Sequence, residues 1–446
     1  MSQVTRKQSA SVGSKAGRFF TRGMFAALKN RDFRFLWAGN LAAQFAMQMQ
    51  MVARGWLIYA MTQSPMMLTW VLLSFAAPSF LFSLFGGVLA DRLQKKRVMM
   101  VAQGLNAMAT VVMATIVMSG HVTFMDFIYF GLFNGTVLAL SMPARQSVIP
   151  ELVAEETLFN AMALSTASMN LSRVCGPALA GAIIAMLADG DTANTFAVGV
   201  VYYIIAALYL IAVASLMLMR YQGNSTMVVE QSVFADIGAG LVYMWRSPLI
   251  FGLLLMAFIP MLFGMPIQFL MPAFNQDMLQ GGADSLGLLL AFNGLGALCG
   301  SLLLSRLGDL RHKGLWLLLL SLGWAVFMAM FAFTTRLALA VPMIALVGLC
   351  SSMYMAMNMS LVQLAVLPAM RGRVNSILMM SFGLMPVGVI PVGYIAEHYG
   401  IDTSLWISAV CLAIVTLVLA VCIPAIRQID QGYAKPPPKA LRKTWP

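Results

Sequence analysis

The chain has 446 residues, of which 60% are hydrophobic and only 10% are charged, with 28 Lys and Arg against 16 Asp and Glu. This composition lies outside the range of soluble globular domains. The excess of cations is confined to the tails and the short loops between long apolar runs. That distribution excludes a basic nucleic-acid interface and indicates a polytopic membrane protein.

The apolar runs are continuous, which favours spanning helices over an alternating barrel, and a spanning helix needs about 20 apolar residues. About twelve such segments are predicted by this length rule. They lie near residues 35–60, 66–89, 98–119, 124–143, 158–188, 196–219, 248–274, 284–305, 313–334, 338–361, 373–397 and 403–426.

The N-terminal tail, residues 1–34, is basic and Ser-rich, and it lacks the apolar core of a cleavable signal peptide. We expect a cytoplasmic tail, with binding to anionic lipid headgroups as the alternative. Cations also gather in the C-terminal tail, residues 428–446, and in the hinges between spans. The positive-inside rule therefore predicts an inner-membrane protein with an even number of spans and both termini in the cytoplasm.

A charged hinge at Gly86–Arg97 reads GGVLADRLQKKR and separates the second and third apolar runs. Its charges cannot lie in hydrocarbon, so it is predicted to form a cytoplasmic turn between two spans. Its paired glycines allow neighbouring backbones to approach closely.

A polar linker at residues 220–247 divides the spans into two sets of six, at 35–219 and 248–427. Helical spacing within the linker predicts an amphipathic helix on the inner membrane surface. Its apolar positions are Phe234, Ile237, Leu241 and Trp245.

The two halves also align weakly with each other. Arg92 and Arg306 are 214 residues apart, and Asn160 and Asn375 are 215 apart. The segment VIPEL at Val148 is echoed by VLPAM further along the chain. Duplicated halves are typical of transporters whose site lies between the repeats.

The charged hinge resembles the signature between the second and third spans of major facilitator superfamily transporters. The matching positions are Gly87, Leu89, Asp91, Arg92, Lys95 and Lys96. Gln94 departs from the pattern, because the family usually has glycine there. The resemblance covers about Arg31 to Arg427 and implies an all-α fold of twelve transmembrane helices in two pseudo-symmetric six-helix halves. A monomer is expected.

Two further resemblances point to export. The motif GPALAG, with Gly176, Pro177 and Gly181 in the fifth span, is similar to the motif of exporters in the superfamily. The phrases RGWLIYAMTQSP, MPARQSVIPELV and RGRVNSI resemble the branch that holds siderophore (enterobactin-type) and macrolide exporters.

Asp91 is a candidate cytoplasmic gate, because the resemblance places the start of the eleventh span nearby. A carboxylate at a helix N-terminus is stabilised by about 0.3–2 kcal/mol, and this contact would form only when the halves close on the cytoplasmic side. Alternatively, Asp91 and its cations solvate a loop and set topology, which is the preferred reading for Lys95 and Lys96. The candidate gate comprises Gly87, Asp91, Arg92, Lys95, Lys96, Arg145 and Arg373.

Arg173 lies near the middle of the fifth span, where an arginine costs about 2.5–3.5 kcal/mol and should face the bundle or a wet cavity. It could attract an anionic or polar substrate, or it could bond to carbonyls freed by Pro177. Arg54 lies nearer the outer end of the first span, and a structural, snorkelling role is favoured there.

Uncharged amides recur in the spans that line the central cavity of the superfamily, and they suit a bulky amphipathic ligand. Alternatively, they only bridge helices. The candidate cavity residues are Gln44, Gln48, Asn134, Gln268 and Asn358.

The energy source is harder to find in the sequence. No GxxxxGK[ST] motif is present, so ATP is not expected to drive the chain, and no cofactor or metal cluster is indicated. Every Asp and Glu falls at a loop or a span end, so proton antiport is implied by the resemblance alone. Asp126 and Asp91 are the best-placed candidate carriers.

Together these features predict a secondary active exporter, not an enzyme, that moves a small amphipathic compound, siderophore-like or drug-like, by alternating access. A lipid flippase of the same fold is the nearest alternative. A non-transporting membrane receptor is the alternative from another class. The expected partners are the small-molecule substrate, protons and membrane lipid, with no nucleic acid.

Overall fold

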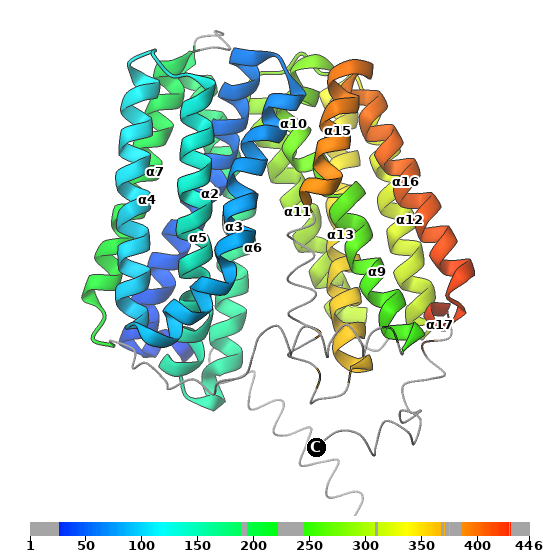
Figure 1. The fold of residues 1–446 in the computed structure, drawn as a ribbon, viewed down its shortest axis with the longest axis horizontal. Coiled ribbons are helices and arrows are strands. Elements are labelled where there is room, and N and C mark those ends of the chain that lie inside the picture. Colours follow the sequence, from blue (N-terminus) through cyan, green and yellow to red (C-terminus); the bar gives the residue numbers. More distant parts are fainter. Residues whose placement is uncertain are drawn as a thin grey trace, which may run out of the picture.

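The computed structural model describes residues 26–188, 194–221, 245, 247–307, 311–366, 370, 374, 385–427 and 429. These residues form helices joined by short turns, arranged in two bundles that stand side by side (Figure 1). The predicted amphipathic segment of the linker lies outside the described residues at Phe234, Ile237 and Leu241. Trp245, at its end, stacks on Phe251 with ring centroids 5.0 Å apart.

The N-terminal bundle contains a short 3-10 helix followed by six long helices. They are η1 (Ala26–Lys29), α2 (Arg31–Thr62), α3 (Pro65–Arg92), α4 (Lys95–Met118), α5 (Phe124–Leu152), α6 (Glu155–Ala188) and α7 (Thr195–Leu218). Their connections are short, so consecutive helices run in opposite directions and each crosses the bundle once.

The C-terminal bundle repeats this arrangement. Its described helices are α9 (Pro248–Phe263), α10 (Pro266–Asp277), α11 (Ala283–Leu307), α12 (Lys313–Ala332), α13 (Leu337–Ala365), α15 (Met385–Tyr399), α16 (Ile401–Cys422) and α17 (Pro424–Arg427). The predicted all-helical membrane fold in two halves is confirmed (Figure 1).

Ten segments of the described chain are long and apolar enough to cross a membrane, with α9 and α10 counted together. Of the other two predicted spans, α2 has 32 residues but is interrupted by polar side chains, and α15 is the described part of the segment predicted at 373–397. Many apolar side chains face outward on these helices, as a lipid-exposed bundle requires.

The span predicted at 248–274 is confirmed as one membrane-length segment, Pro248–Asp277, but its helix is interrupted. The helix stops at Phe263, and α10 restarts with Pro266 in its first turn. Proline has no N–H to continue the ladder, and Met265 donates instead to the Pro260 carbonyl at 2.8 Å. Gly264 fills the break because a Cβ there would lie 2.4 Å from the Trp324 ring.

The charged hinge is shorter than predicted. Helix α3 continues through Arg92, and only Leu93 and Gln94 separate it from α4. Similarly, α5 does not end near residue 143 but continues through Pro143 and Pro150 to Leu152. Apolar length alone therefore underestimated how far these helices continue.

The internal repeat has a structural counterpart. Arg92 is the last residue of α3, and Arg306 lies in the last turn of α11, the corresponding helix of the other half. In each half this helix packs closely on another through glycine: a Cβ on Gly135 would lie 2.2 Å from the Phe75 carbonyl oxygen, and one on Gly348 would lie 2.1 Å from that of Asn293. Asn375 lies outside the described residues.

Candidate functional site

The two halves are joined by hydrogen bonds at one end of the bundle, which we call the latch end; it contains the turn between α2 and α3. The Tyr59 hydroxyl donates to the Asp277 carboxylate at 2.5 Å. Beside it, the Gln63 amide donates to the Gln276 side-chain oxygen at 3.3 Å. Both bonds join α2, or the residue just after it, to α10, so they cross from one half to the other.

A second carboxylate at the latch end also links the halves. The Ser64 hydroxyl and the Met66 backbone N–H both donate to Oε2 of Glu397, at 2.7 and 3.2 Å. Glu397 lies on α15, and further along these two helices Thr69 fits against Gly393, where a Cβ would lie 2.2 Å from the threonine Oγ1. Glu397 therefore accepts one backbone N–H and one hydroxyl from the start of a helix of the opposite half.

The exporter-like motif lies where the halves cross. A Cβ on Gly181 would lie 2.4 Å from the Ala283 carbonyl oxygen, and one on Gly287 would lie 2.6 Å from that of Pro177. Near the middle of the bundle, a Cβ on Gly294 would lie 2.9 Å from the Arg173 carbonyl oxygen. Glycines on both helices therefore allow α6 and α11 to touch backbone to backbone.

Gly176 belongs to the same motif but faces a different helix. A Cβ there would lie 2.7 Å from the Gln48 Cβ on α2. Gln48, a predicted cavity residue, is thus partly covered by the α6 backbone. The motif positions α6 between α2 of its own half and α11 of the other half.

At the opposite end, which we call the hinge end, the polar contacts found for the described residues of the N-terminal half stay within that half. The Lys95 ammonium is buried and pairs with the Glu151 carboxylate, at the start of α4 and the end of α5. The Tyr221 hydroxyl donates to the other oxygen of Glu151. Burial is the larger cause, and this hydrogen bond the second, of a raised pKa of Tyr221, so the phenol stays protonated and can donate. Lys95 therefore pairs with a carboxylate and does not solvate the loop, while its part in setting the membrane topology stays a prediction.

The same end also fastens the chain that leaves α7. The Asp32 carboxylate accepts the backbone N–H groups of Arg220 and Tyr221 at 2.9 and 3.0 Å. Lys96 donates to the Met219 carbonyl oxygen, so it too bonds to protein and does not only meet solvent. These bonds hold the beginning of the linker against the N-terminal half.

For the remaining gate candidates, the structure describes either the backbone alone or nothing. Gly87, Asp91 and Arg92 lie in the last turns of α3, but their side chains lie outside the described residues. Arg373 also lies outside them. Asp91 as a gate therefore stays a prediction.

Arg145 lines a hollow of about 130 Å³ between α2, α5 and α6. Gln44 lies in the same hollow, and its Oε1 and the Arg145 Nε are both buried without a hydrogen-bond partner in the described part of the chain. The other lining side chains mix polar and apolar groups. They are Trp37, Asn40, Met142, Gln146, Ile149, Ser165 and Ser168.

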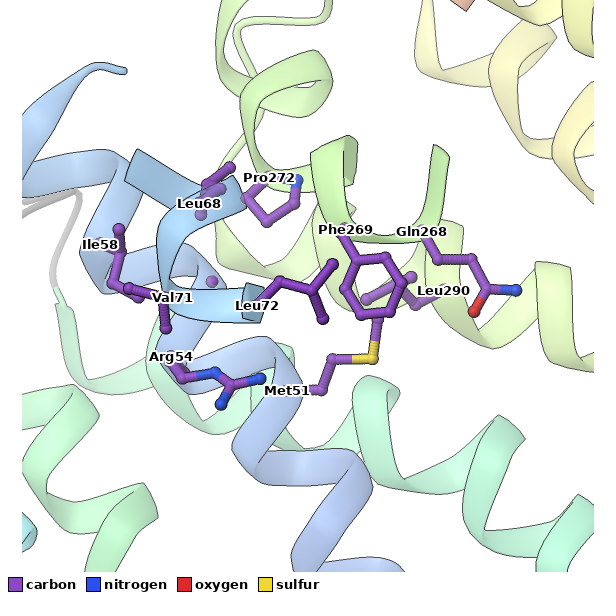
Figure 2. Close-up of a pocket in the computed structure, with 11 residues that line it drawn as sticks. Met51, Arg54, Ile58, Leu68, Val71, Leu72, Gln268, Phe269, Pro272 and Leu290 are labelled. Carbon is purple, nitrogen blue, oxygen red and sulfur yellow. The ribbon is translucent and has the colours of Figure 1, made fainter. Parts of the chain in front are cut away.

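A second, smaller pocket lies between the halves and contains Arg54 and Gln268 (Figure 2). Figure 2 shows the Arg54 guanidinium extending beside Met51 and Leu72, with Phe269 across the pocket. The Arg54 guanidinium carbon lies 5.9 Å from the centre of the Phe75 ring. This pocket combines one cation with apolar walls from both halves.

The predicted cavity amides divide into two groups. Gln44 and Gln268 line the two pockets. Asn134 is buried and donates to the Phe130 carbonyl of its own helix at 2.9 Å, and Asn358 donates to the Leu253 carbonyl of α9 at 3.2 Å. The contact of Asn358 fits the helix-bridging alternative, whereas the bond of Asn134 stays within its own helix.

Asp126, a predicted proton carrier, has a structural contact. Its carboxylate accepts the Thr123 backbone N–H at 2.8 Å and forms a capping box at the start of α5. In contrast, sequence reasoning missed Tyr59, Asp277 and Glu397 as a group. Asp277 and Glu397 each lie at the end of a span of the same half, and this was the signal in the sequence that could have pointed to them.

The comparisons with known proteins agree with this geometry. Residues 22–442 match the model of the family described as transmembrane secretion effector. The enterobactin exporter EntS of Shigella boydii is 26% identical over 298 residues, which cover 67% of this chain and 69% of that protein. EntS of Escherichia coli matches to the same extent.

Solved structures show the same fold. A bacterial homologue of the human lysosomal transporter Spinster, in an inward-facing and unoccupied conformation, has a TM-score of 0.69 at 14% identity, and the match covers 90% of this chain and 98% of that one. A D-xylose–proton symporter has a TM-score of 0.68 at 14% identity, covering 89% and 98%.

Two bundles of antiparallel membrane helices that meet at one end define this protein as a membrane transporter of the major facilitator fold. Within that class, the chain belongs to the transmembrane secretion effector family.

Proposed function

We propose that the protein exports a small amphipathic compound, siderophore-like or drug-like, across the bacterial inner membrane by alternating access. The observation that carries this proposal is the one-sided contact between the halves. The four hydrogen bonds that join the halves in the described part of the chain all lie at the latch end. At the hinge end, the described polar side chains bond within the N-terminal half.

The charge distribution supports the direction of transport. The hinge end carries Lys95, Lys96 and Arg97, so the positive-inside rule orients it toward the cytoplasm. The latch end then faces outward, and the structure corresponds to a state open to the cytoplasm. A compound would enter there and leave after the latch opens and the hinge end closes.

Closure at the hinge end would use the gate predicted around Asp91. Helices α3 and α15 are neighbours across the halves, and Asp91 lies in the last turn of α3 (Figure 1). On the proposed route, Asp91 meets the segment before α15, which contains Arg373, when the halves rock together. Proton antiport is part of this proposal.

The proposal is tested by the Asp91→Asn variant. We expect it to insert normally and to abolish net efflux, because the charged gate is lost. Mass-spectrometric profiles of the medium would compare cells that produce the wild type, this variant or no transporter. Asp284→Asn, an exposed carboxylate at the start of α11, is the matched control and should keep the wild-type profile. Identical profiles from the wild type and Asp91→Asn would show that Asp91 does not act as a gate.

A further inference from the structure

The N-terminal half carries three arginines inside its spans, and this charge is not balanced there. Arg54 lies on α2, Arg145 on α5 and Arg173 on α6, each several residues from the helix ends. Every described carboxylate lies near a helix end or in a turn. The described part of the C-terminal half has its cations at helix ends or in turns as well. The imbalance is therefore specific to one half.

No carboxylate among the described residues lies within 4.0 Å of these guanidinium groups. The ion pair found among the described residues joins Lys95 to Glu151. Arg54 has the Phe75 ring as its contact, at 5.9 Å. Arg145 has a buried Nε with no hydrogen-bond partner. A guanidinium in a membrane span requires an anion, a ring or water, since it cannot lose its proton.

Two of the three arginines line pockets, and these pockets lie at different positions between the hinge end and the latch end. Arg145 lies toward the hinge end, which is the proposed entrance, and shares its hollow with Gln44. Arg54 lies toward the latch end, in the pocket between the halves. Gln44 and Arg54 lie on the same helix, α2, so the two pockets are linked along that helix. Together they mark a path from the entrance toward the closed latch.

We propose that the exported compound is an amphipathic anion whose acidic groups are bound by Arg54, Arg145 and Arg173. This inference rests on the proposed export function. The pocket beside Arg54 is small, about 30 Å³, and its apolar wall, formed by Met51, Leu72 and Phe269, would face the hydrophobic part of the compound as the halves move apart (Figure 2).

Charge also bears on the energy source. A bacterial cytoplasm is electrically negative relative to the outside, so the membrane potential drives an anion outward. An anionic cargo would therefore gain electrical driving force without a titratable carboxylate in the middle of the spans. This accounts for acidic side chains that are confined to helix ends in the described chain.

Two dyes that share a xanthene ring separate charge from shape. Fluorescein is an anion at neutral pH, and rhodamine 6G is a cation. Fluorescence polarisation with the purified full chain in lipid nanodiscs would measure both dissociation constants. We expect the wild type to bind fluorescein at least about tenfold more tightly than rhodamine 6G, the effect of one charge-assisted contact. Equal affinities, or no fluorescein binding, would overturn the inference.

The arginines are then tested one at a time. Arg54→Gln, Arg145→Gln and Arg173→Gln should each weaken fluorescein binding about tenfold and leave rhodamine 6G binding equal or tighter. Arg54→Lys keeps the charge and should keep most of the affinity. Arg336→Gln, an exposed arginine before α13, is the matched control and should change neither constant. Unchanged fluorescein binding in all three Gln variants would mean that water alone solvates these groups.

The two proposals fail in different ways. Export by alternating access fails if cysteine labelling finds only one accessible state of the protein. The anion inference alone fails if labelling finds two states while fluorescein shows no preference over rhodamine 6G.

Discussion

The two ends of the bundle use polar side chains differently. At the latch end, Asp277 and Glu397 accept hydrogen bonds from residues of the other half. At the hinge end, Glu151 and Asp32 accept hydrogen bonds from their own half. One set of carboxylates therefore joins two bodies, and the other makes one body rigid. A transporter that rocks needs both, because a rigid half transmits motion only if its links to the other half can break.

The largest expected effect comes from the crossing of α6 and α11. Gly181→Leu would place a side chain where a Cβ already lies 2.4 Å from the Ala283 carbonyl oxygen. We expect a loss of transport of at least about tenfold, and a loss of about 1–3 kcal/mol in stability from overpacking. Export profiles and thermal unfolding in detergent would measure the two effects.

Gly104 on α4 is the matched control for this substitution, because a Cβ there meets nothing within 4 Å. Gly104→Ala should leave transport unchanged and raise stability by about 0.5–1 kcal/mol through helix propensity. Normal transport by Gly181→Leu would show that the close crossing is not required.

The buried ion pair at the hinge end gives the next effect. Lys95→Met would leave Glu151 without its cation and should lower the unfolding free energy by about 1–3 kcal/mol. The loss is smaller than for a fully buried pair because the Glu151 side chain keeps 35% of its exposure. Thermal unfolding measures it, with the exposed Lys29→Met as the control.

The double variant Lys95→Met/Glu151→Gln sharpens this test. Removing both charges should recover part of the lost stability, because no carboxylate is left unpaired. Additive losses in the double variant would mean that the two side chains do not interact, and the hinge end would then not be a rigid body by this contact.

The latch should give the smallest effect on stability but a measurable shift in conformation. Glu397→Ala removes two hydrogen bonds between the halves, worth about 0.5–1.5 kcal/mol in net terms, and should move the equilibrium about two- to tenfold toward the outward-open state. The rate of maleimide labelling at Thr69→Cys, a position 1% exposed, reports this shift in a cysteine-free background.

Glu156→Ala, an exposed carboxylate at the start of α6, is the control for the latch variant and should leave the labelling rate unchanged. A labelling rate in Glu397→Ala equal to that of the parent would show that Glu397 does not hold the halves together.

Apolar length predicted the fold well because each spanning helix must satisfy its own backbone within one continuous segment. It missed the interruption between α9 and α10, because apolar length ignores the missing N–H of Pro266. The Trp324 ring, which lies 60 residues beyond Gly264 in the chain, requires glycine there and could not be found from the local sequence. The tolerance of α5 for Pro143 and Pro150 was also missed, because the rest of the helix compensates for the lost bonds.

The candidate site was predictable only in part. Arg145 and Gln44 line one hollow, as charged and polar groups in spans should. Lys95 and Glu151 are 56 residues apart, and no local pattern reveals such a pair. Asp277 and Glu397 look like ordinary loop-end carboxylates in the sequence. Only the packing of the two halves gives them partners.

Transport requires the latch to open in every cycle. Gln63→Cys and Gln276→Cys, whose native side chains touch at 3.3 Å, joined by a bifunctional thiol reagent that reduction cleaves, would lock it in a cysteine-free background. Export of the compounds that the wild type releases should stop on cross-linking and return on reduction. Export at the wild-type rate by the fully cross-linked protein would contradict the account.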